Sequence, residues 1–186
     1  GEDGLRGRGV AYCATCDGGF YRGKTVAVAG GGNSAAEDAL TLSKLCKKVY
    51  LIHRRDTLSA TRSYLKPLEK AENIEFLWNK QVTGFEVDGT LTGLTLTDTQ
   101  TGAESQLPVD GLFVAIGRQP NTWLVKDQLE LDRQGYIVAD ESCRTSQPGV
   151  FAIGDVRTKP LRQVVTAVAD GATASKYLEE YLNGLD

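Results

Sequence analysis

Hydrophobic residues follow two patterns along the first 117 residues. Apolar runs without alternation are typical of strands buried on both faces, and they occur at residues 25–29, 49–52, 74–77 and 112–116. Between the first two runs an apolar helix face recurs, made of Ala35, Ala39, Leu42 and Cys46. A strand, a helix and a second strand in one short unit predict a parallel sheet. A second helix is expected over residues 60–71, with a break or kink at Pro67.

The texture of the sequence changes after residue 80. Residues 81–107 alternate apolar and polar positions and contain the turn signals Asp88-Gly89 and Thr101-Gly102, which predict an antiparallel meander. Further on, strands are expected at residues 136–138 and 150–153. A helix there is expected to carry one apolar stripe, formed by Leu161, Val164, Val165, Val168 and Ala172. Glycine and proline near residues 117–121 indicate a boundary between two domains, 1–117 and 118–186.

Composition narrows the class of protein. The chain has 186 residues, enough for one ordinary domain or two small ones. It is 41% hydrophobic and 24% charged with a net charge of −3, so we expect a folded protein without a basic surface for nucleic acid or anionic membranes. No apolar run approaches the roughly 18 residues of a spanning helix, and no apolar leader is visible. The sequence contains no methionine, which suggests a processed or partial chain.

A glycine-rich turn joins the first expected strand to the first expected helix as Gly30-x-Gly32-x-x-Ala35. The first glycine permits a tight turn, the second lets a pyrophosphate approach the backbone, and Ala35 keeps the helix close to the strand. The free N–H groups and the dipole of the helix then favour a bound anion. The pattern predicts a dinucleotide site, and the alternative is a turn without a ligand.

The residues that end the second strand, His53-Arg54-Arg55, indicate which dinucleotide is bound. An NAD site carries an acidic residue about 20 positions beyond the glycines, where it binds the ribose 2′-hydroxyl. Two arginines there would instead attract a 2′-phosphate and favour NADPH. The alternative is a solvated pair of charges. His53, the only histidine, is interpreted either as a neighbour of the nucleotide or as a strand-end residue.

Two of the 4 cysteines form the motif Cys13-Ala14-Thr15-Cys16. Such a pair suits cycling between dithiol and disulfide, and the carboxyl group of Asp17 can exchange protons with a thiolate. Half of a zinc site is the alternative, but zinc needs a second pair. Cys46 is instead expected in the core and Cys143 in a loop. Because a dithiol does not accept a hydride, a carrier such as flavin is implied between nicotinamide and cysteines.

Together these motifs resemble the low-molecular-weight bacterial thioredoxin reductases along the whole chain. The resemblance is carried by Cys13-Ala14-Thr15-Cys16-Asp17-Gly18, Gly30-Gly31-Gly32-Asn33-Ser34-Ala35, His53-Arg54-Arg55-Asp56, Phe113-Val114-Ala115-Ile116-Gly117 with Pro120-Asn121, and Gly154-Asp155-Val156 with Arg162-Gln163. It implies an α/β fold in which a three-layer Rossmann-like NADPH domain is followed by the C-terminal segment of a split FAD domain. It also implies a cytoplasmic homodimer that passes electrons from NADPH through FAD and the cysteine pair to thioredoxin.

The resemblance assigns roles to single residues. Cys13 would exchange with thioredoxin, Cys16 would face the flavin, and Asp17 would be the acid–base residue. Arg8 would contact thioredoxin. The NADPH site would comprise Gly30, Gly31, Gly32, Asn33, Ser34, Ala35, His53, Arg54, Arg55, Arg62, Ile116 and Gly117. The flavin ribityl and phosphate groups would lie near Gly154 and Asp155, and the isoalloxazine near Arg162, Gln163 and Val164.

Three departures from the family pattern qualify these expectations. Ser59 stands where the family usually has a further arginine. After Gly18 the family often has two aromatic residues, but here Gly19 precedes Phe20. The FAD half that usually begins the family's chain does not precede Gly1, so we expect exposed apolar surfaces after residue 117 and weak or no FAD binding. A flavoprotein reductase of a peroxiredoxin and a non-catalytic NADP(H)-binding module remain alternatives.

Overall fold

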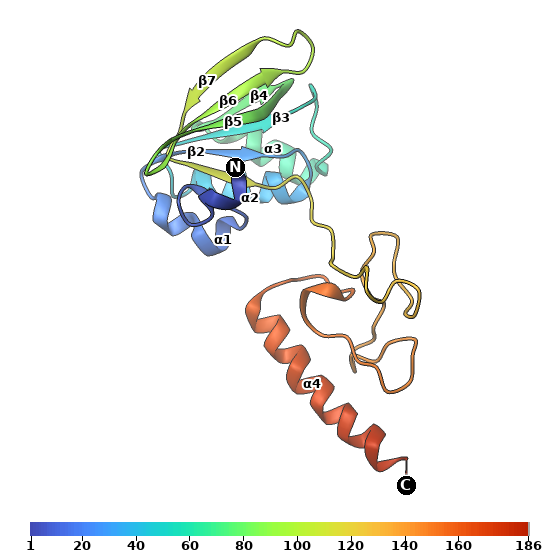
Figure 1. The fold of residues 1–186 in the computed structure, drawn as a ribbon. Helices are drawn as coiled ribbons and strands as arrows, with labels where there is room; N and C mark the ends of the chain where they lie inside the picture. Colours follow the sequence, from blue (N-terminus) through green and yellow to red (C-terminus); the bar gives the residue numbers. More distant parts are fainter. Residues whose placement is uncertain (186) are drawn as a thin grey trace. The chain divides into compact units, whose positions relative to one another are not determined.

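A computed structural model describes residues 1–185, and the chain divides into two compact units, Gly1–Gly117 and a second one that starts at Arg118. The N-terminal unit has three layers, with helices on one face of a parallel sheet and an antiparallel sheet on the other (Figure 1). The parallel strands, in spatial order, are β1 (Val10–Ala11), β8 (Gly111–Val114), β2 (Thr25–Ala29), β3 (Lys48–His53) and β4 (Ile74–Trp78). The antiparallel strands are β5 (Lys80–Asp88), β6 (Thr90–Asp98) and β7 (Glu104–Pro108).

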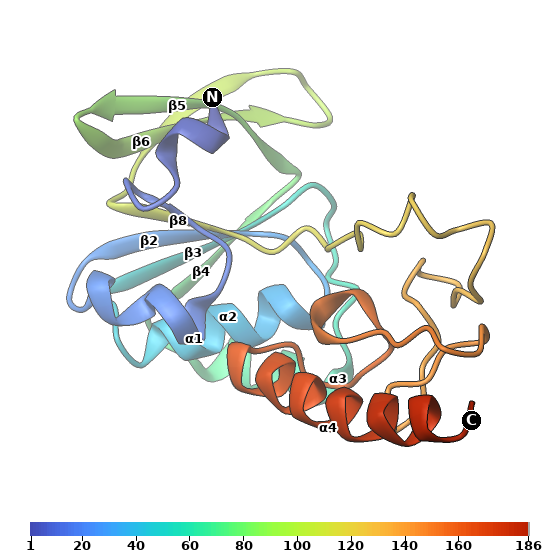
Figure 2. The same cartoon turned by 60° about the horizontal axis from the view of Figure 1, so that its bottom comes forward.

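The helices of this unit are mostly crossovers between parallel strands. They are η1 (Glu2–Leu5), α1 (Ala14–Asp17), η2 (Gly18–Tyr21), α2 (Asn33–Ser43) and α3 (Arg62–Lys70). Since α2 connects β2 to β3 and α3 leads from β3 towards β4, both helices cover the same face of the sheet (Figure 2).

The central strand β2 shows why the apolar runs do not alternate. Its side chains point in turn to opposite faces. Val26 and Val28 are fully buried against the helices, whereas Ala27 packs among the leucines of the meander, including Leu91 and Leu94. Both faces of β2 are therefore buried. The expected α/β architecture with its parallel sheet and meander is confirmed.

Three details of the N-terminal unit differ from expectation. Helix α3 continues through Pro67. The backbone bond that Pro67 cannot donate would go to the carbonyl of Ser63, which lies in an exposed turn where water can replace it. Cys46 lies beyond the end of α2 rather than on its face, yet it is buried in the same core. Strand β1 is only two residues long, too short for a periodic signal.

The C-terminal unit contains η3 (Gly154–Val156), α4 (Val164–Asn183) and long irregular segments. Its small core is formed by Leu129, Ile137 and Ala152. The strands expected at residues 136–138 and 150–153 are wrong, because only single-residue bridges form there, at Ile137 and Phe151. No other strand within residues 118–185 runs beside them to extend the pairing.

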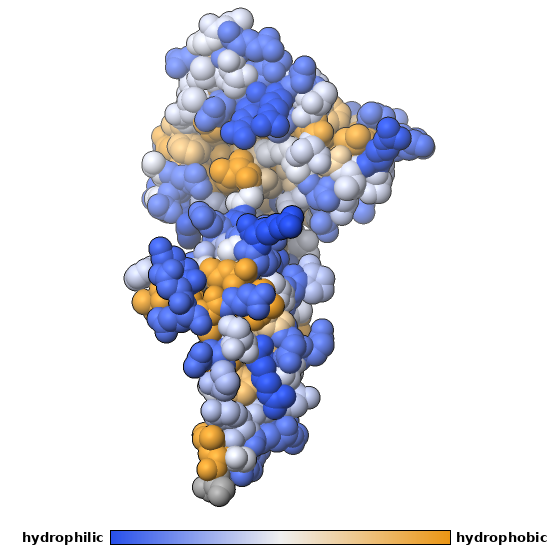
Figure 3. Space-filling view, turned by 90° about the vertical axis from the view of Figure 1, so that its right-hand side faces the viewer, coloured by the Kyte–Doolittle hydropathy of each residue, from blue (hydrophilic) through white to orange (hydrophobic). Residues whose placement is uncertain are grey.

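The apolar stripe expected on helix α4 is exposed. It begins at Val164, so Leu161 precedes the helix, contrary to expectation. Val164 is 82% exposed and Val165 72%. The expected exposure of this surface is confirmed, and Figure 3 shows hydrophobic side chains gathered on the surface of this unit. None of the helices within residues 1–185 combines the length and hydropathy needed to cross a bilayer.

Substitutions should distinguish this exposed stripe from the true core. Val165→Ser and Val168→Ser together should change the free energy of unfolding by no more than about 0.5 kcal/mol per site, because both side chains already meet water. Leu68→Ala in α3, where the side chain is 1% exposed, should cost about 2–5 kcal/mol. Urea unfolding followed by circular dichroism measures both, and a large loss in the double valine variant would show that the stripe is buried.

Candidate functional site

A cavity of about 540 Å³ opens at the carboxyl ends of β2, β3 and β8 in the N-terminal unit. The chain adds β3 and β4 on one side of β2 and returns to place β8 on the other, so the cavity lies where the strand order reverses. Ligands of open α/β sheets bind at such switch points. The cavity wall brings together the expected residues Gly30, Gly31, Gly32, Asn33, Ser34, His53, Arg54, Arg55, Ile116 and Gly117.

The glycine turn is built by close approach of backbone to its neighbours. A Cβ atom at Gly30 would lie 2.8 Å from the Cβ of Ala35 and 2.9 Å from the carbonyl carbon of Ala115. A Cβ atom at Gly31 would overlap the ring of His53. These positions therefore exclude side chains, and at Gly30 the backbone N–H is already used, because it donates to the carbonyl of Ile52 at 3.0 Å.

Helix α2 begins at this turn. Gly32 is its N-cap, and the exposed Asn33 and Ser34 of its first turn line the cavity. Ala35 itself is fully buried between the helix and the sheet, outside the cavity wall. The positive end of the helix dipole therefore meets the cavity, which favours a phosphate there.

Two arginines supply positive charge beside this helix end. Arg54 and Arg55 are exposed on the cavity wall directly after β3, and neither forms an ion pair within residues 1–185. Burial and the charges of Arg55 and Arg54 lower the pKa of His53, so its ring is neutral at pH 7. The neutral ring of His53 thus packs against Gly31, and the positive charge on this side of the cavity comes from the guanidinium groups of Arg54 and Arg55.

The loop that follows β3 is tied to the glycine turn. Both the backbone N–H and the hydroxyl of Ser59 donate to the carbonyl oxygen of Gly31, at 2.8 and 3.1 Å. The N–H of Thr61 donates to Asn33 Oδ1 at 2.8 Å. Ser59 therefore holds the turn but contributes no charge. Arg62, expected to assist the other arginines, is exposed at the start of α3 and lies outside the cavity wall.

Sequence reasoning missed the residues that the meander brings to the cavity. Lys80, Gln81 and Phe85 of β5 line its wall together with Glu2 of η1, and Lys80 Nζ forms an ion pair with Asp98 Oδ2 at 2.8 Å. Alternation along β5 predicted a half-buried strand, but it could not show which end of the meander lies at the carboxyl edge of the parallel sheet. The register between distant strands decides that, and no local signal reports it.

The cysteine pair forms a disulfide between Cys13 and Cys16 in the same unit. Cys13 is the half-buried N-cap of α1, and its Sγ accepts a hydrogen bond from the N–H of Cys16 at 3.1 Å, whereas Cys16 is exposed. The N–H of Asp17 donates to the carbonyl of Cys13 at 3.0 Å. Among residues 1–185 no group of three or more His, Cys, Asp or Glu side chains is arranged to hold a metal ion.

Arg8, which the resemblance assigns to thioredoxin contact, and Phe20 both lie on the surface of this unit. The guanidinium of Arg8 donates two hydrogen bonds to the carbonyl of Gly89, at 3.0 and 2.8 Å, so it also braces the turn between β5 and β6. Phe20, close in sequence to the disulfide, is 78% exposed.

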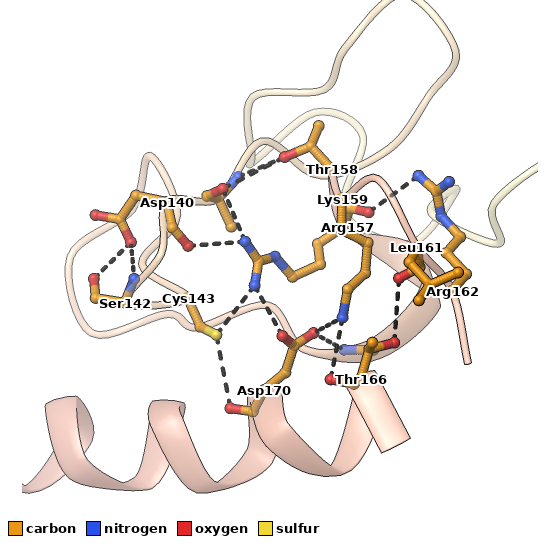
Figure 4. Close-up of polar contacts among 12 residues, drawn as sticks. Asp140, Ser142, Cys143, Arg157, Thr158, Lys159, Leu161, Arg162, Thr166 and Asp170 are labelled. Atoms are coloured by element: carbon orange, nitrogen blue, oxygen red, sulfur yellow. Dashed lines mark hydrogen bonds and ion pairs between the residues drawn. The ribbon is translucent and has the colours of Figure 1, made fainter. Parts of the chain in front are cut away.

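In the C-terminal unit, a buried carboxylate organises the turn before α4 (Figure 4). Asp170 Oδ1 pairs with Arg157 at 3.1 Å, and Oδ2 pairs with Lys159 at 2.5 Å. Oδ2 also accepts the N–H of Gly154 at 2.9 Å. Arg157 and Asp170 are both less than a tenth exposed, so these bonds anchor η3 to α4 away from water.

Cys143 belongs to this network and is not the incidental loop residue that was expected. Its side chain is fully buried. Its Sγ accepts a hydrogen bond from Arg157 at 3.3 Å, and the thiol donates to the backbone carbonyl of Asp170 at 3.6 Å. Burial raises the pKa of the Cys143 thiol, which stays protonated. The loop is closed by Asp140, whose Oδ1 accepts the N–H groups of Ser142 and Arg144. No periodic pattern in the sequence marks such a residue as buried.

The residues that the resemblance assigns to flavin lie on η3 and at the start of α4. Asp155 and Val164 are exposed, and Gln163 is the N-cap of α4. The guanidinium of Arg162 stacks 3.8 Å from the ring centre of Tyr136, and its buried Nε has no hydrogen-bond partner within residues 1–185. An unpartnered buried donor beside an exposed turn fits a site for a polar ligand.

Comparison with known proteins gives consistent results along the chain. Residues 1–171 match the family model described as pyridine nucleotide-disulphide oxidoreductase. The chain is 45% identical over 185 residues to a thioredoxin reductase of Streptomyces clavuligerus, covering 99% of this chain and 58% of that protein. It is 44% identical over 191 residues to a thioredoxin reductase of Listeria monocytogenes, covering 100% of this chain and 60% of that protein.

Solved structures agree with the sequence matches. The thioredoxin reductase of Streptococcus pyogenes superposes with a TM-score of 0.88 at 40% identity, covering 95% of this chain and 58% of the solved chain. The chain therefore spans between 58% and 60% of the length of these relatives.

The Asp170 network predicts a pH dependence of stability. Burial alone would raise the pKa of Asp170, but Lys159, the N–H of Gly154 and Arg157 hold it below its usual value. A lowered pKa stabilises the folded state above the unfolded-state value of about 4, and this stability is lost as the pH falls through the lower folded-state pKa. Urea unfolding of the wild type should therefore show a falling free energy below about pH 4.

Asp170→Asn tests that assignment. It leaves two cations buried without their counter-charge and should cost about 3–5 kcal/mol at pH 7, while flattening the loss of stability in acid. Glu180→Gln breaks the exposed pair with Lys176 and should change little. An acid profile of Asp170→Asn as steep as that of the wild type would assign the pH dependence to other carboxylates.

Proposed function

Because this chain belongs to the pyridine nucleotide-disulphide oxidoreductase family, we propose that it carries the NADPH site and the redox-active disulfide of a thioredoxin reductase. One observation carries the proposal: a helix N-terminus and the guanidinium groups of Arg54 and Arg55, which form no ion pair among residues 1–185, line one cavity in the unit that also holds the Cys13–Cys16 disulfide. The N-terminal turn of α2, which starts at Gly32, would bind the pyrophosphate, and the arginines would bind the 2′-phosphate.

The proposed reaction oxidises NADPH to NADP⁺ and reduces a thioredoxin disulfide to a dithiol, with one proton consumed. FAD, when bound, supplies the two-electron relay between the hydride donor and the protein disulfide. The thiolate of Cys13 would attack the disulfide of thioredoxin and form a mixed disulfide, which the thiolate of Cys16 would resolve, re-forming the Cys13–Cys16 bond. Asp17, next in sequence to Cys16, would exchange the thiol protons.

The flavin would be held by Gly154, Asp155, Arg162, Gln163 and Val164. Support comes from the position of these residues around η3 and the start of α4, and from the Nε of Arg162, which has no hydrogen-bond partner in the described part of the chain. The exposed valines of α4 would be covered in the proposed enzyme, so we expect the 186-residue chain to bind FAD weakly or not at all. A homodimer in the cytoplasm completes the proposal.

Removing both guanidinium groups should weaken binding of the phosphorylated nucleotide only. Arg54→Ala with Arg55→Ala should raise the Kd for NADP⁺ by about tenfold or more, because about half of the roughly 4 kcal/mol attraction of one close charge pair already suffices. The Kd for NAD⁺ should not change. Isothermal titration calorimetry measures both, with Arg22→Ala on the same unit as the control. Equal weakening of both nucleotides would remove the case for 2′-phosphate recognition.

Single cysteine variants should reveal which sulfur meets thioredoxin. The probe is a thioredoxin with one active-site cysteine, activated as a disulfide with thionitrobenzoate. In Cys16→Ser, the Cys13 thiolate should displace thionitrobenzoate and leave a covalent complex between the two proteins, detected by non-reducing electrophoresis. Cys13→Ser should form it much more slowly. Since Cys16 is the more exposed sulfur here, faster trapping by Cys16 would reverse the proposed order of transfer.

A further inference from the structure

The segment that carries the two arginines is held by the antiparallel sheet. The hydroxyl of Thr99, in the turn after β6, donates to the carbonyl of Arg54 at 3.1 Å. The N–H of Asn79, between β4 and β5, donates to the carbonyl of Arg55 at 3.2 Å. The N–H of Thr99 donates in turn to the carbonyl of Asn79 at 2.8 Å, which joins the two contacts into one clamp.

These contacts matter because the parallel sheet no longer holds the segment. Pairing between β3 and β4 ends at His53 and Trp78, one residue before Arg54. A segment without strand partners has to lose backbone freedom when it binds a ligand. Ser59 and Thr61 anchor the far end of the loop, so the clamp restrains the end that carries the charges.

The turn that presents Thr99 is itself rigidly built. Asp98 Oδ1 accepts the N–H groups of Gln100 and Thr101, both at 2.9 Å, and Oδ2 pairs with Lys80. Lys80 and these N–H groups lower the pKa of Asp98, which therefore stays charged. Asn79 has a φ of 53°, a left-handed conformation that asparagine tolerates better than most residues and that directs its N–H to the loop.

We propose that Thr99 and Asn79 are positioning residues that orient Arg54 and Arg55 towards the 2′-phosphate and so determine the preference for NADP(H) over NAD(H). This inference rests on the proposed nucleotide site. The clamp contacts only the backbone of the arginines, so it leaves both guanidinium groups available to the ligand. It is distinct from a general structural contact because its loss should affect the one phosphate group that these arginines bind.

Thr99→Val tests the clamp, since it removes the hydroxyl and keeps the shape of the side chain. Titration calorimetry of the full chain should show the Kd for NADP⁺ rising about 3- to 10-fold, the size of one lost hydrogen bond, with the Kd for NAD⁺ unchanged within about twofold. Thr99→Ser should restore wild-type affinity. Thr97→Val is the matched control, because the hydroxyl of Thr97 pairs with that of Thr83 on the same sheet, at 2.8 Å, and not with the segment that carries the arginines.

The outcomes separate the clamp from the site itself. A wild-type chain that binds NADP⁺ no more tightly than NAD⁺ would overturn the proposed site and the clamp together. A wild type that prefers NADP⁺ alongside a Thr99→Val variant that keeps the same preference would overturn the clamp alone. Equal weakening of both nucleotides would also overturn it, because the contact would then support the whole cavity. In the Arg54→Ala background, Thr99→Val should weaken NADP⁺ binding less than it does in the wild type, because one of the two arginines that the clamp positions is already absent.

Discussion

The candidate site depends on how closely the chain approaches itself at Gly30 and Gly31. Backbone from β2 passes the carbonyl of Ala115 and the Cβ of Ala35 at distances that leave no room for a side chain, and the His53 ring fills the space beside Gly31. That contact joins the ends of three parallel strands to the start of α2. The cavity exists because the three strand ends and the helix meet at this point, so its shape is a property of the fold more than of any one lining residue.

The positive charge at the cavity comes from two sources of different strength. The helix end and its backbone N–H groups supply a partial positive charge that suits any phosphate. In the proposed site, Arg54 and Arg55 provide the selectivity. They lie on a segment beyond the end of β3, and hydrogen bonds from the turns at Asn79 and Thr99 hold the carbonyl groups of this segment. The antiparallel sheet thereby has two functions: its leucines cover one face of the parallel sheet, and its turns brace the residues proposed to recognise the nucleotide.

The C-terminal unit follows a different principle. Its apolar core is small, and much of its order comes from Asp170, which gathers Arg157, Lys159 and the backbone of Gly154 in a buried cluster. Such a network holds one arrangement because each removed partner would leave a buried charge. The side of α4 that carries Val164 and Val165 is exposed, and thioredoxin reductases similar to this chain along its length are longer proteins.

Local patterns in the sequence were enough to predict the longer parallel strands of the N-terminal unit, the crossover helix, the meander and the glycine turn, because each has a period or a spacing of its own. The residues that bind through distant contacts could not be found that way. Thr99 and Asn79 brace Arg54 and Arg55 only because two sheets pack face to face, and Cys143 is buried only because Arg157 and Asp170 reach it from other segments. Pairing across many residues is decided by tertiary packing, which places side chains and backbone groups together without leaving a signal in the order of the amino acids.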